Sequence, residues 1–171
     1  MPTCPRCAIL ALAVAFLAFS GCDSNGATRD LELVEGAYEV AELSFQPNAT
    51  SIAPVDLAAD LDLTVTRLQI FGADTEALFV TKFRDSGSRR TNLTVSASRG
   101  RASFRGLTPD DEAELADVFL PSQFDLTYDQ SRPGRLEGTF SQTVNLEAFD
   151  AQRYSGLRSV PGRLMVRLVR L

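Results

Sequence analysis

Three cysteines carry the most distinctive chemistry in this chain of 171 residues. Cys4 and Cys7 have the C-x-x-C spacing of redox or metal-binding dithiols, and Cys22 follows the small residues Ser20 and Gly21. The dithiol spacing stands before an apolar run, with no strand before it and no helix to hold it, so we expect no redox or metal function there. Cys22 closes the apolar run, and a thiol at that place points to covalent modification.

Acidic pairs are the next candidates for chemistry, because glycosidases work with two carboxyl groups. Asp110 with Asp111 begins an expected helix, and Asp60 with Asp62 falls on the solvent face of an expected strand. The chain has no histidine, the commonest general base and transition-metal ligand, and Lys82 is its only lysine. It also has no serine-hydrolase, zinc-protease, P-loop or dinucleotide-binding motif. We therefore expect no enzymatic activity, no cofactor and no bound metal.

The N-terminus is typical of an export signal. The apolar run over 8–19 is shorter than the about twenty residues that a membrane-spanning helix needs, and it fits the hydrophobic part of a secretory signal. The series Phe19-Ser20-Gly21-Cys22 resembles the cleavage box of bacterial lipoproteins, with phenylalanine where leucine is usual. The resemblance implies cleavage after Gly21 and acylation of Cys22. It places the protein on a membrane of the bacterial cell envelope, inner or outer.

This signal divides the chain into three parts. Residues 1–21 are the expected signal peptide, 22–32 the acylated N-terminus with a flexible tether, and 33–171 a single β domain. The tether is polar, as flexible linkers are. The net charge of −5 argues against a nucleic-acid partner.

Apolar and polar residues alternate from about residue 33 onward, which is the period of β-strands. The clearest case is a hairpin over 92–105, with Arg99-Gly100 as its turn. A shift of phase near Ala41-Glu42 predicts a β-bulge in the first strand. The chain is therefore expected to be mainly β.

Other segments refine this prediction. The alternation over 61–65 predicts a strand, and Gly138 predicts a bend or close packing inside a long strand over 136–146. One short helix is expected near 109–119, where Thr108 is a suitable N-cap and a proline follows it.

About eight strands joined by hairpins favour an antiparallel meander, and pairing of the last strand with the first would close it into a barrel without open edges. A β-sandwich is the alternative. The order of features resembles small bacterial lipoproteins with lipocalin-like barrels: an acylated cysteine, a short tether, Gly36-Ala37-Tyr38 opening the first strand, a meander and a C-terminal strand. The resemblance implies a lipocalin-like barrel.

The first functional hypothesis is a binding module for a small apolar ligand, because an eight-stranded barrel can hold one. Inward-facing aromatic residues would form the wall of the cavity, and Gln142 or an arginine its polar anchor. The same aromatic residues also suit a solid core. The main candidates for the lining are Tyr38, Phe45, Phe104, Tyr128 and Phe140, with Phe71, Phe79, Phe83, Phe119 and Phe124 completing the set.

The second hypothesis is a structural or assembly lipoprotein of the envelope with a filled core. Its surface would contact an acidic envelope protein or lipid headgroups. An enclosed cavity would favour the first hypothesis and a filled barrel the second. The expected partner surface consists of Arg89, Arg90, Arg99, Arg101 and Arg105.

Overall fold

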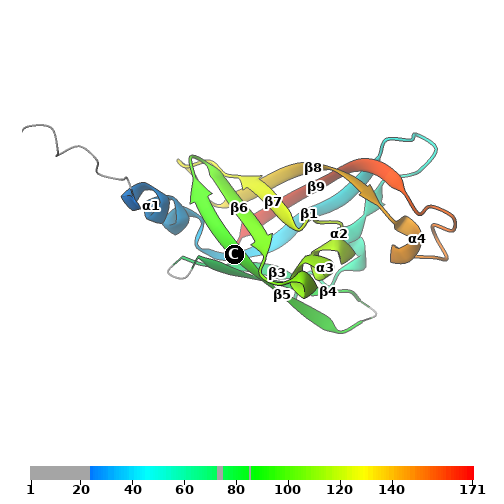
Figure 1. The fold of residues 1–171 in the computed structure, drawn as a ribbon, viewed down its shortest axis with the longest axis horizontal. Coiled ribbons are helices and arrows are strands. Elements are labelled where there is room, and N and C mark those ends of the chain that lie inside the picture. The colour runs from blue at the N-terminus through cyan, green and yellow to red at the C-terminus, as the bar shows by residue number, and fades with distance from the viewer. Residues whose placement is uncertain (1–23, 73–74, 85) are drawn as a thin grey trace, which may run out of the picture.

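A computed structural model describes residues 24–72, 75–84 and 86–171 of the protein. A nine-stranded antiparallel sheet forms most of it, and short helices lie around the sheet (Figure 1). The strands are β1 (Gly36–Pro47), β2 (Val55–Asp56), β3 (Arg67–Phe71), β4 (Glu76–Lys82), β5 (Ser88–Ser98), β6 (Arg101–Gly106), β7 (Gln123–Thr127), β8 (Arg135–Val144) and β9 (Val160–Arg170). The helices of this part of the chain are α1 (Ser24–Val34), α2 (Leu57–Asp60), α3 (Pro109–Asp117) and α4 (Leu146–Phe149).

The sheet closes on itself because β9 pairs with β1. All strands except the short β2 form a closed eight-stranded barrel in chain order. The β1–β9 register runs from Tyr38 opposite Arg170 to Pro47 opposite Gly162, and it shifts between Val40 and Glu42. This shift confirms the predicted bulge. Closure of a single sheet confirms the predicted barrel and excludes the β-sandwich.

The hairpin of β5 and β6 confirms the clearest strand prediction. Buried and exposed residues alternate along β5 from Thr91 to Ala97, so one face of the strand lies in the core. Arg99 and Gly100 form the turn with φ angles of 52° and 77°. Two positive φ angles give the turn type whose twist matches that of the flanking strands.

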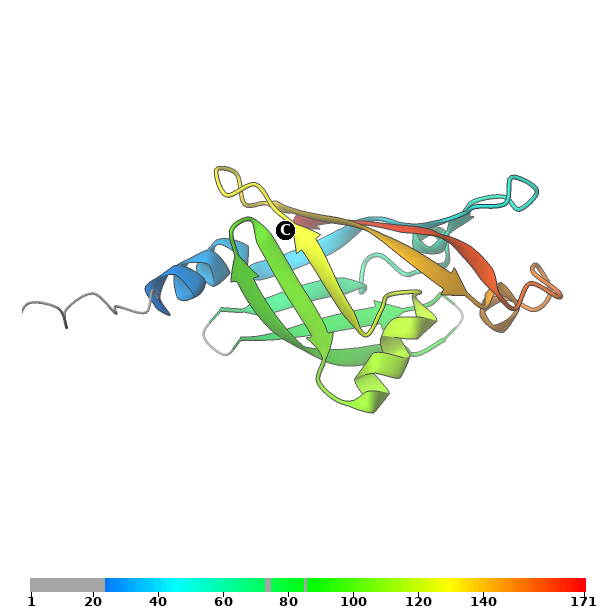
Figure 2. The same cartoon turned by 45° about the horizontal axis from the view of Figure 1, so that its top comes forward.

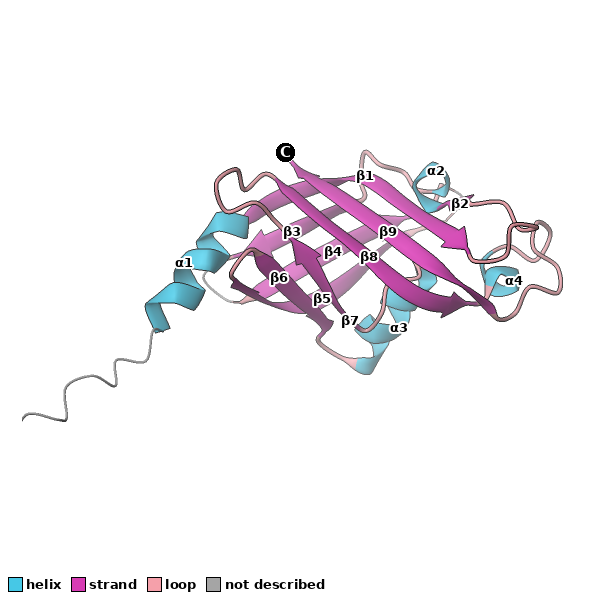
Figure 3. Ribbon diagram, turned by 90° about the horizontal axis from the view of Figure 1, so that it is seen from above, coloured by secondary structure: helices cyan, strands magenta, loops and turns pink. Residues whose placement is uncertain are grey.

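Helix α1 covers one end of the barrel (Figures 1 and 3). Leu31 and Val34 are buried against the core. The hydroxyl of Tyr38 donates to the carbonyl of Val34 at 2.8 Å, and the Arg170 guanidinium donates to the carbonyl of Leu33 and to the Tyr38 hydroxyl. These bonds satisfy carbonyls that the last turn of a helix leaves without partners. Burial raises the pKa of Tyr38, although Arg170 opposes the shift.

The segment predicted as a flexible tether over 22–32 is helical from Ser24 onward. Asp30 links this helix to the barrel, because its Oδ2 accepts the backbone N–H of Arg99 at 2.7 Å and its Oδ1 accepts the Gln130 amide at 3.4 Å. The buried residues near the end of α1 add apolar contact. Tertiary packing therefore orders a segment whose composition is that of a linker.

Helix α3 confirms the predicted helix near 109–119. Thr108 accepts the backbone N–H of Asp111 at 3.2 Å, Asp111 accepts that of Thr108 at 3.0 Å, and Pro109 occupies the first helical position. Asp111 also accepts the backbone N–H of Asn92 at 2.7 Å, which fastens the helix to β5. Helices α3 and α4 lie toward the end of the barrel opposite α1 (Figure 2).

The strand predicted over 61–65 is wrong. Leu61 forms an isolated bridge with Phe83, a turn follows, and β3 starts only at Arg67. The side chain of Asp62 accepts the backbone N–H of Thr64 at 3.2 Å and its hydroxyl at 2.6 Å. Such local bonds to an aspartate compete with strand pairing.

Strand β8 is close to the strand predicted over 136–146, but it stops at Val144 because Asn145 caps α4. Gly138 confirms the prediction of close packing. A Cβ at this position would lie 2.5 Å from Cζ of Phe140 and 3.0 Å from the carbonyl oxygen of Asp125.

Candidate functional site

All the predicted lining residues except Phe71 lie in or beside a filled core. The prediction for Phe71 is wrong, because this last residue of β3 is exposed. A void of about 10 Å³ lies among the core residues Val40, Leu68 and Phe79, and it is about the space of a single water molecule. Phe104 stacks on Phe124 with ring centroids 5.2 Å apart, and Phe140 meets Phe124 edge to face at 6.0 Å. Of the main candidates, Tyr38, Phe45, Phe104 and Tyr128 are buried, and Phe140 is half-buried beside β7.

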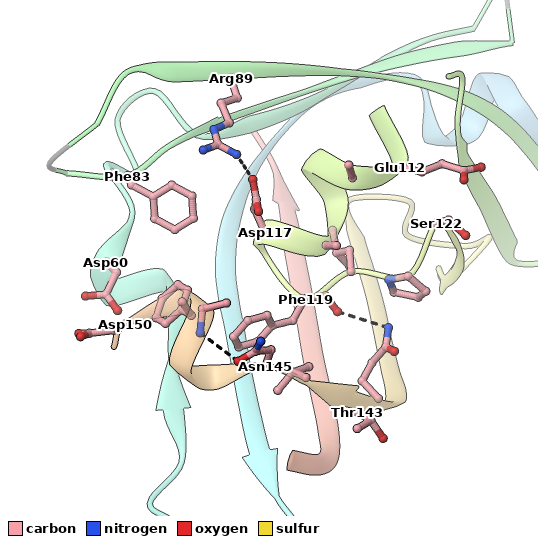
Figure 4. A pocket seen from close by; sticks show the side chains of 18 of the residues that line it. Asp60, Phe83, Arg89, Glu112, Asp117, Phe119, Ser122, Thr143, Asn145 and Asp150 are labelled. Carbon is pink, nitrogen blue, oxygen red and sulfur yellow. Dashed lines mark hydrogen bonds and ion pairs between the residues drawn. The ribbon is translucent and has the colours of Figure 1, made fainter. Parts of the chain in front are cut away.

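A larger pocket opens at the end of the barrel opposite α1, and we call it the mouth pocket. Its volume is about 1060 Å³. Helices α3 and α4, the β4–β5 hairpin and the end of β8 form its walls (Figure 4). Lining residues include Phe83, Arg89, Phe119, Gln142 and Phe149. Three of these, Phe83, Phe119 and Gln142, were in the wider set predicted for a binding cavity.

A row of aromatic rings forms the floor of the mouth pocket. Phe119 lies edge to face against the core residue Phe45, with centroids 5.7 Å apart, and against Phe149 of α4 at 5.3 Å. Phe149 in turn meets Phe83 at 6.2 Å. The row runs from the barrel core to the rim, so the pocket offers a continuous apolar surface to a ligand.

Phe119 holds this position at a cost in backbone energy. Its φ angle is 62°, in the left-handed region that a bulky residue rarely adopts. It stands just after α3, where its N–H bonds the carbonyl of Ala116 and the N–H of Leu120 bonds that of Leu115, both at 3.0 Å. Glycine is usual at this place in such a helix ending. Strained residues of this kind cluster at functional sites, which makes the mouth pocket the leading candidate.

Polar contacts at the rim hold the walls together. Gln142 of β8 donates to the carbonyl of Phe119 at 3.3 Å, and Arg89 of β5 forms an ion pair with Asp117 at the end of α3 (Figure 4). Asp60 also lines the pocket, and its ion pair with Arg153 spans 3.5 Å. Most of these rim charges neutralise one another, so the pocket best suits a ligand that is largely apolar.

The two acidic pairs serve local structure. The Asp62 carboxylate lies 3.0 Å from the ammonium of Lys82, and hydrogen bonds from Thr64 and Lys82 lower its pKa. Asp111 caps α3, as described above. Across the ranges that the structure describes, no group of three or more metal-ligating residues is arranged to hold an ion.

The five arginines of the predicted partner surface lie on β5, on β6 or in their turn. Arg90 and Arg99 have no carboxylate partner among the described residues, although Asp30 accepts the backbone N–H of Arg99. The other three arginines form ion pairs, which are Arg89 with Asp117, Arg101 with Asp125 at 3.3 Å and Arg105 with Glu112 at 3.8 Å. Acidic neighbours therefore balance most of the positive charge of this hairpin.

Sequence reasoning missed Phe149, because it predicted only a loop or short helical piece over 148–160 and placed the end of the preceding strand at residue 146, where α4 begins. Asn145 accepts the N–H of Ala148 at 3.0 Å and begins this short helix, so an asparagine followed by an apolar turn was the available signal.

The predicted cleavage and lipidation residues, Gly21 and Cys22, lie outside the described residues. None of the described helices combines the length and apolar character needed to cross a membrane.

In comparisons with known proteins, no family model, no curated protein and no solved structure matches this chain.

Proposed function

We propose that this protein is a lipid-anchored component of the bacterial cell envelope that binds a small apolar ligand in the mouth pocket. The observation that carries the proposal is the strained Phe119, which connects the core to an aromatic floor open to solvent. The half-buried rings of Phe83 and Phe149 line the pocket and favour binding of another apolar body.

The dimensions favour the mouth over the interior of the barrel. Sites for small ligands measure about 300–1,000 Å³ and are mostly apolar with a few polar groups. The mouth pocket has about 1060 Å³, whereas the interior void has about 10 Å³. We therefore place the ligand against Phe119 and Phe149 and not inside the barrel.

Binding of N-phenyl-1-naphthylamine, an apolar dye that brightens in apolar surroundings, tests this proposal directly. The chain has no tryptophan, so the intrinsic background is low. We expect Phe149→Ser to weaken dye binding about tenfold or more, since it removes a ring of the floor. Phe71→Ser is the matched control, because Phe71 is 41% exposed on β3 and does not line the pocket. Equal binding by both variants would contradict the proposal, provided that urea unfolding shows both to be folded.

The anchor rests on the Phe19-Ser20-Gly21-Cys22 series and has its own test. We expect Cys22→Ser to move the protein from the membrane fraction of a bacterial expression host to the soluble periplasmic fraction. Cys4→Ser and Cys7→Ser should stay in the membrane fraction, because both residues precede the expected cleavage site. Retention of the Cys22→Ser protein in the membrane would argue against lipidation.

The filled interior also supports a second candidate, an assembly lipoprotein that acts through its arginine-rich hairpin. Arg90 and Arg99 are the residues of this surface to test, since the guanidinium groups of the other three meet carboxylates. Loss of an envelope partner from pull-downs with the Arg90→Ser, Arg99→Ser double variant, with dye binding intact, would favour this candidate.

A further inference from the structure

The barrel wall is nearly open between β7 and β8. These strands share a single register pair, Thr127 opposite Glu137, whereas β6 pairs with all of β7 and β9 pairs with all of β8. Figure 2 shows the yellow β7 and the gold β8 close together near the end that carries α1 and diverging toward α3. We call the gap beside residues 139–144 of β8 the seam.

The orientation of the β8 backbone follows from the neighbouring hydrogen bonds. The hydroxyl of Thr127 donates to the carbonyl of Glu137 at 3.1 Å, so the backbone groups of Glu137 point toward β7. On β9, the carbonyl of Pro161 accepts from Asn48 on the β1 side. Backbone groups alternate in direction along a strand, so those of Ser141 and Thr143 point into the seam.

No strand of the described structure lies in register with Ser141 or Thr143 on that side. Side chains hold the seam instead, because Gln142 donates to the carbonyl of Phe119 and Phe140 packs on Phe124. An unpaired strand edge presents a row of N–H and C=O groups that another strand can pair with.

Two pockets lie next to the open edge of β8. A groove of about 910 Å³ runs along the outside of the seam, and Thr139 and Phe140 are among its lining residues. Phe124 and Val166 line both this groove and the small interior void, so the wall is thin there. Toward the other end, Thr143 lines the mouth pocket. An extended chain beside β8 thus meets open space toward both ends of residues 139–144, beside Thr139 and beside Thr143.

We propose that the seam is a strand-addition site, at which an extended segment of a partner polypeptide pairs with residues 139–144 of β8. Main-chain hydrogen bonds provide affinity in this mode of recognition, and alternate side chains provide specificity. The site adjoins the mouth pocket, which Thr143 and Val144 also line, but its occupant is a polypeptide and not a small molecule.

The side chains around the open edge of β8 determine which residues the partner's segment must carry. Ser141 and Thr143 are exposed on the outer face of β8, and Arg163 of β9 lies opposite Ser141. Arg163 is exposed, has no carboxylate partner among the described residues and can extend over the small Ser141. The outer face of the segment is therefore polar, with an acidic residue beside Arg163. Its inner face meets the apolar residues Leu120 and Val144, with Gln142 as the one polar neighbour on β8, and is mostly apolar.

Synthetic peptides test the proposal. The probe has about seven residues, with valine at alternate positions and threonine and one aspartate between them. Fluorescence anisotropy should show that it binds, and a shuffled peptide of the same composition should bind about tenfold less tightly or worse. N-methylation of the alternate amides that face β8 should abolish binding, whereas N-methylation of the other alternate set should not. Amide exchange at Ser141 and Thr143 should slow in the complex.

Protein variants complete the test. Ser141→Pro removes an N–H that faces the seam, and Ser141→Thr keeps it and is the matched control. We expect S141P to lose peptide binding and to keep dye binding at the mouth, because Ser141 does not line that pocket. Equal peptide binding by S141P and S141T, or equal binding of the probe and its shuffled form, would overturn the proposal. Failure of the dye experiment alone would count against the mouth pocket and leave the seam unaffected.

Discussion

At the residue scale, Phe119 shows how one side chain links the barrel core to the candidate site. Its ring contacts Phe45 on one side and Phe149 on the other. Its backbone adopts a conformation that costs most residues about 1–2 kcal/mol. Backbone conformation alone would favour glycine at this position, and the ring contacts offset the strain.

This conflict predicts a specific order of stabilities. Phe119→Ala should lower the free energy of unfolding by about 3–5 kcal/mol, the usual cost of removing a buried phenylalanine. Phe119→Gly removes the same ring but relieves the backbone, so it should be about 1 kcal/mol more stable than Phe119→Ala. Urea unfolding of the two variants measures the difference. If the alanine variant is the more stable one, backbone strain is not what distinguishes this residue.

Asp111 gives a second prediction at this scale. Burial alone raises the pKa of its carboxyl, but hydrogen bonds from Thr108 and Asn92 outweigh burial and lower the pKa below the usual value. Its charged form therefore stabilises the folded protein above the ordinary pKa of about 3.9, and this contribution is lost as the pH falls through the lowered value.

We expect Asp111→Asn to cost about 1–2 kcal/mol at pH 7, the usual value of a charged cap, and to cost less as the pH falls below about 4. Urea midpoints of both proteins at pH 7 and pH 3 measure this change. The comparison isolates Asp111 from Asp62 and Asp129, whose pKa values are also lowered and which both proteins share. A cost that stays constant with pH would contradict the assignment.

At the element scale, Gly138 determines how closely β7 and β8 approach each other. A methyl group there would lie 2.8 Å from Cδ2 of Leu126 and 3.0 Å from the carbonyl of Asp125. We expect Gly138→Ala to cost about 1–3 kcal/mol, because the strands must move apart to admit it. Gly134→Ala is the control, since nothing lies within 4 Å of a Cβ at Gly134. Equal unfolding midpoints for the two variants would show that β7 and β8 can move apart without loss of stability.

The elements that could be predicted from sequence are those with local signals. Thr108 and Pro109 mark the start of α3, and the Arg99-Gly100 turn with its flanking alternation marks the β5–β6 hairpin. The segment 61–65 has the same alternation, but the hydrogen bonds of Asp62 turn the chain there. Alternation of apolar and polar residues therefore predicted a strand correctly only where no side chain formed hydrogen bonds with the neighbouring backbone.

The candidate site was harder to predict than the fold. Phe83, Phe119 and Gln142 were recognised as possible lining residues, but their meeting at the mouth depends on the turn after α3. The left-handed backbone of Phe119 contradicts the preference of its residue type, so propensity cannot reveal it. The open seam also has no local signal, because it arises where the neighbouring strands β7 and β8 diverge beyond their one register pair.

At the scale of the whole molecule, α1 and the mouth pocket lie at opposite ends of the barrel (Figure 1). If Cys22 carries the lipid, α1 begins only two residues later, at Ser24. The α1 end is then held close to the membrane, and the mouth faces away from it.

Cysteine labelling on vesicles tests this orientation. The acylated chain would have no free thiol, so an introduced cysteine is the only target of a membrane-impermeant maleimide. We expect Ser86→Cys at the mouth to react equally fast on vesicles and in detergent. Ser131→Cys, in the loop beside the α1 end, should react several-fold more slowly on vesicles. Equal slowing at both positions would contradict the orientation.

The pairing of β1 with β9 joins the two ends of the domain, and this has a consequence for folding if the protein is exported, as we propose. Contacts between residues far apart in sequence are slow to form, because a long loop must close first. The hairpins from β3 to β6 can form as soon as they emerge from the translocation channel. The edge of β1 stays open until the last strand, Val160–Arg170, has also emerged. For an exported chain, chaperones of the envelope would act during this interval. Loss of a few C-terminal residues would harm folding more than equal losses in a surface loop.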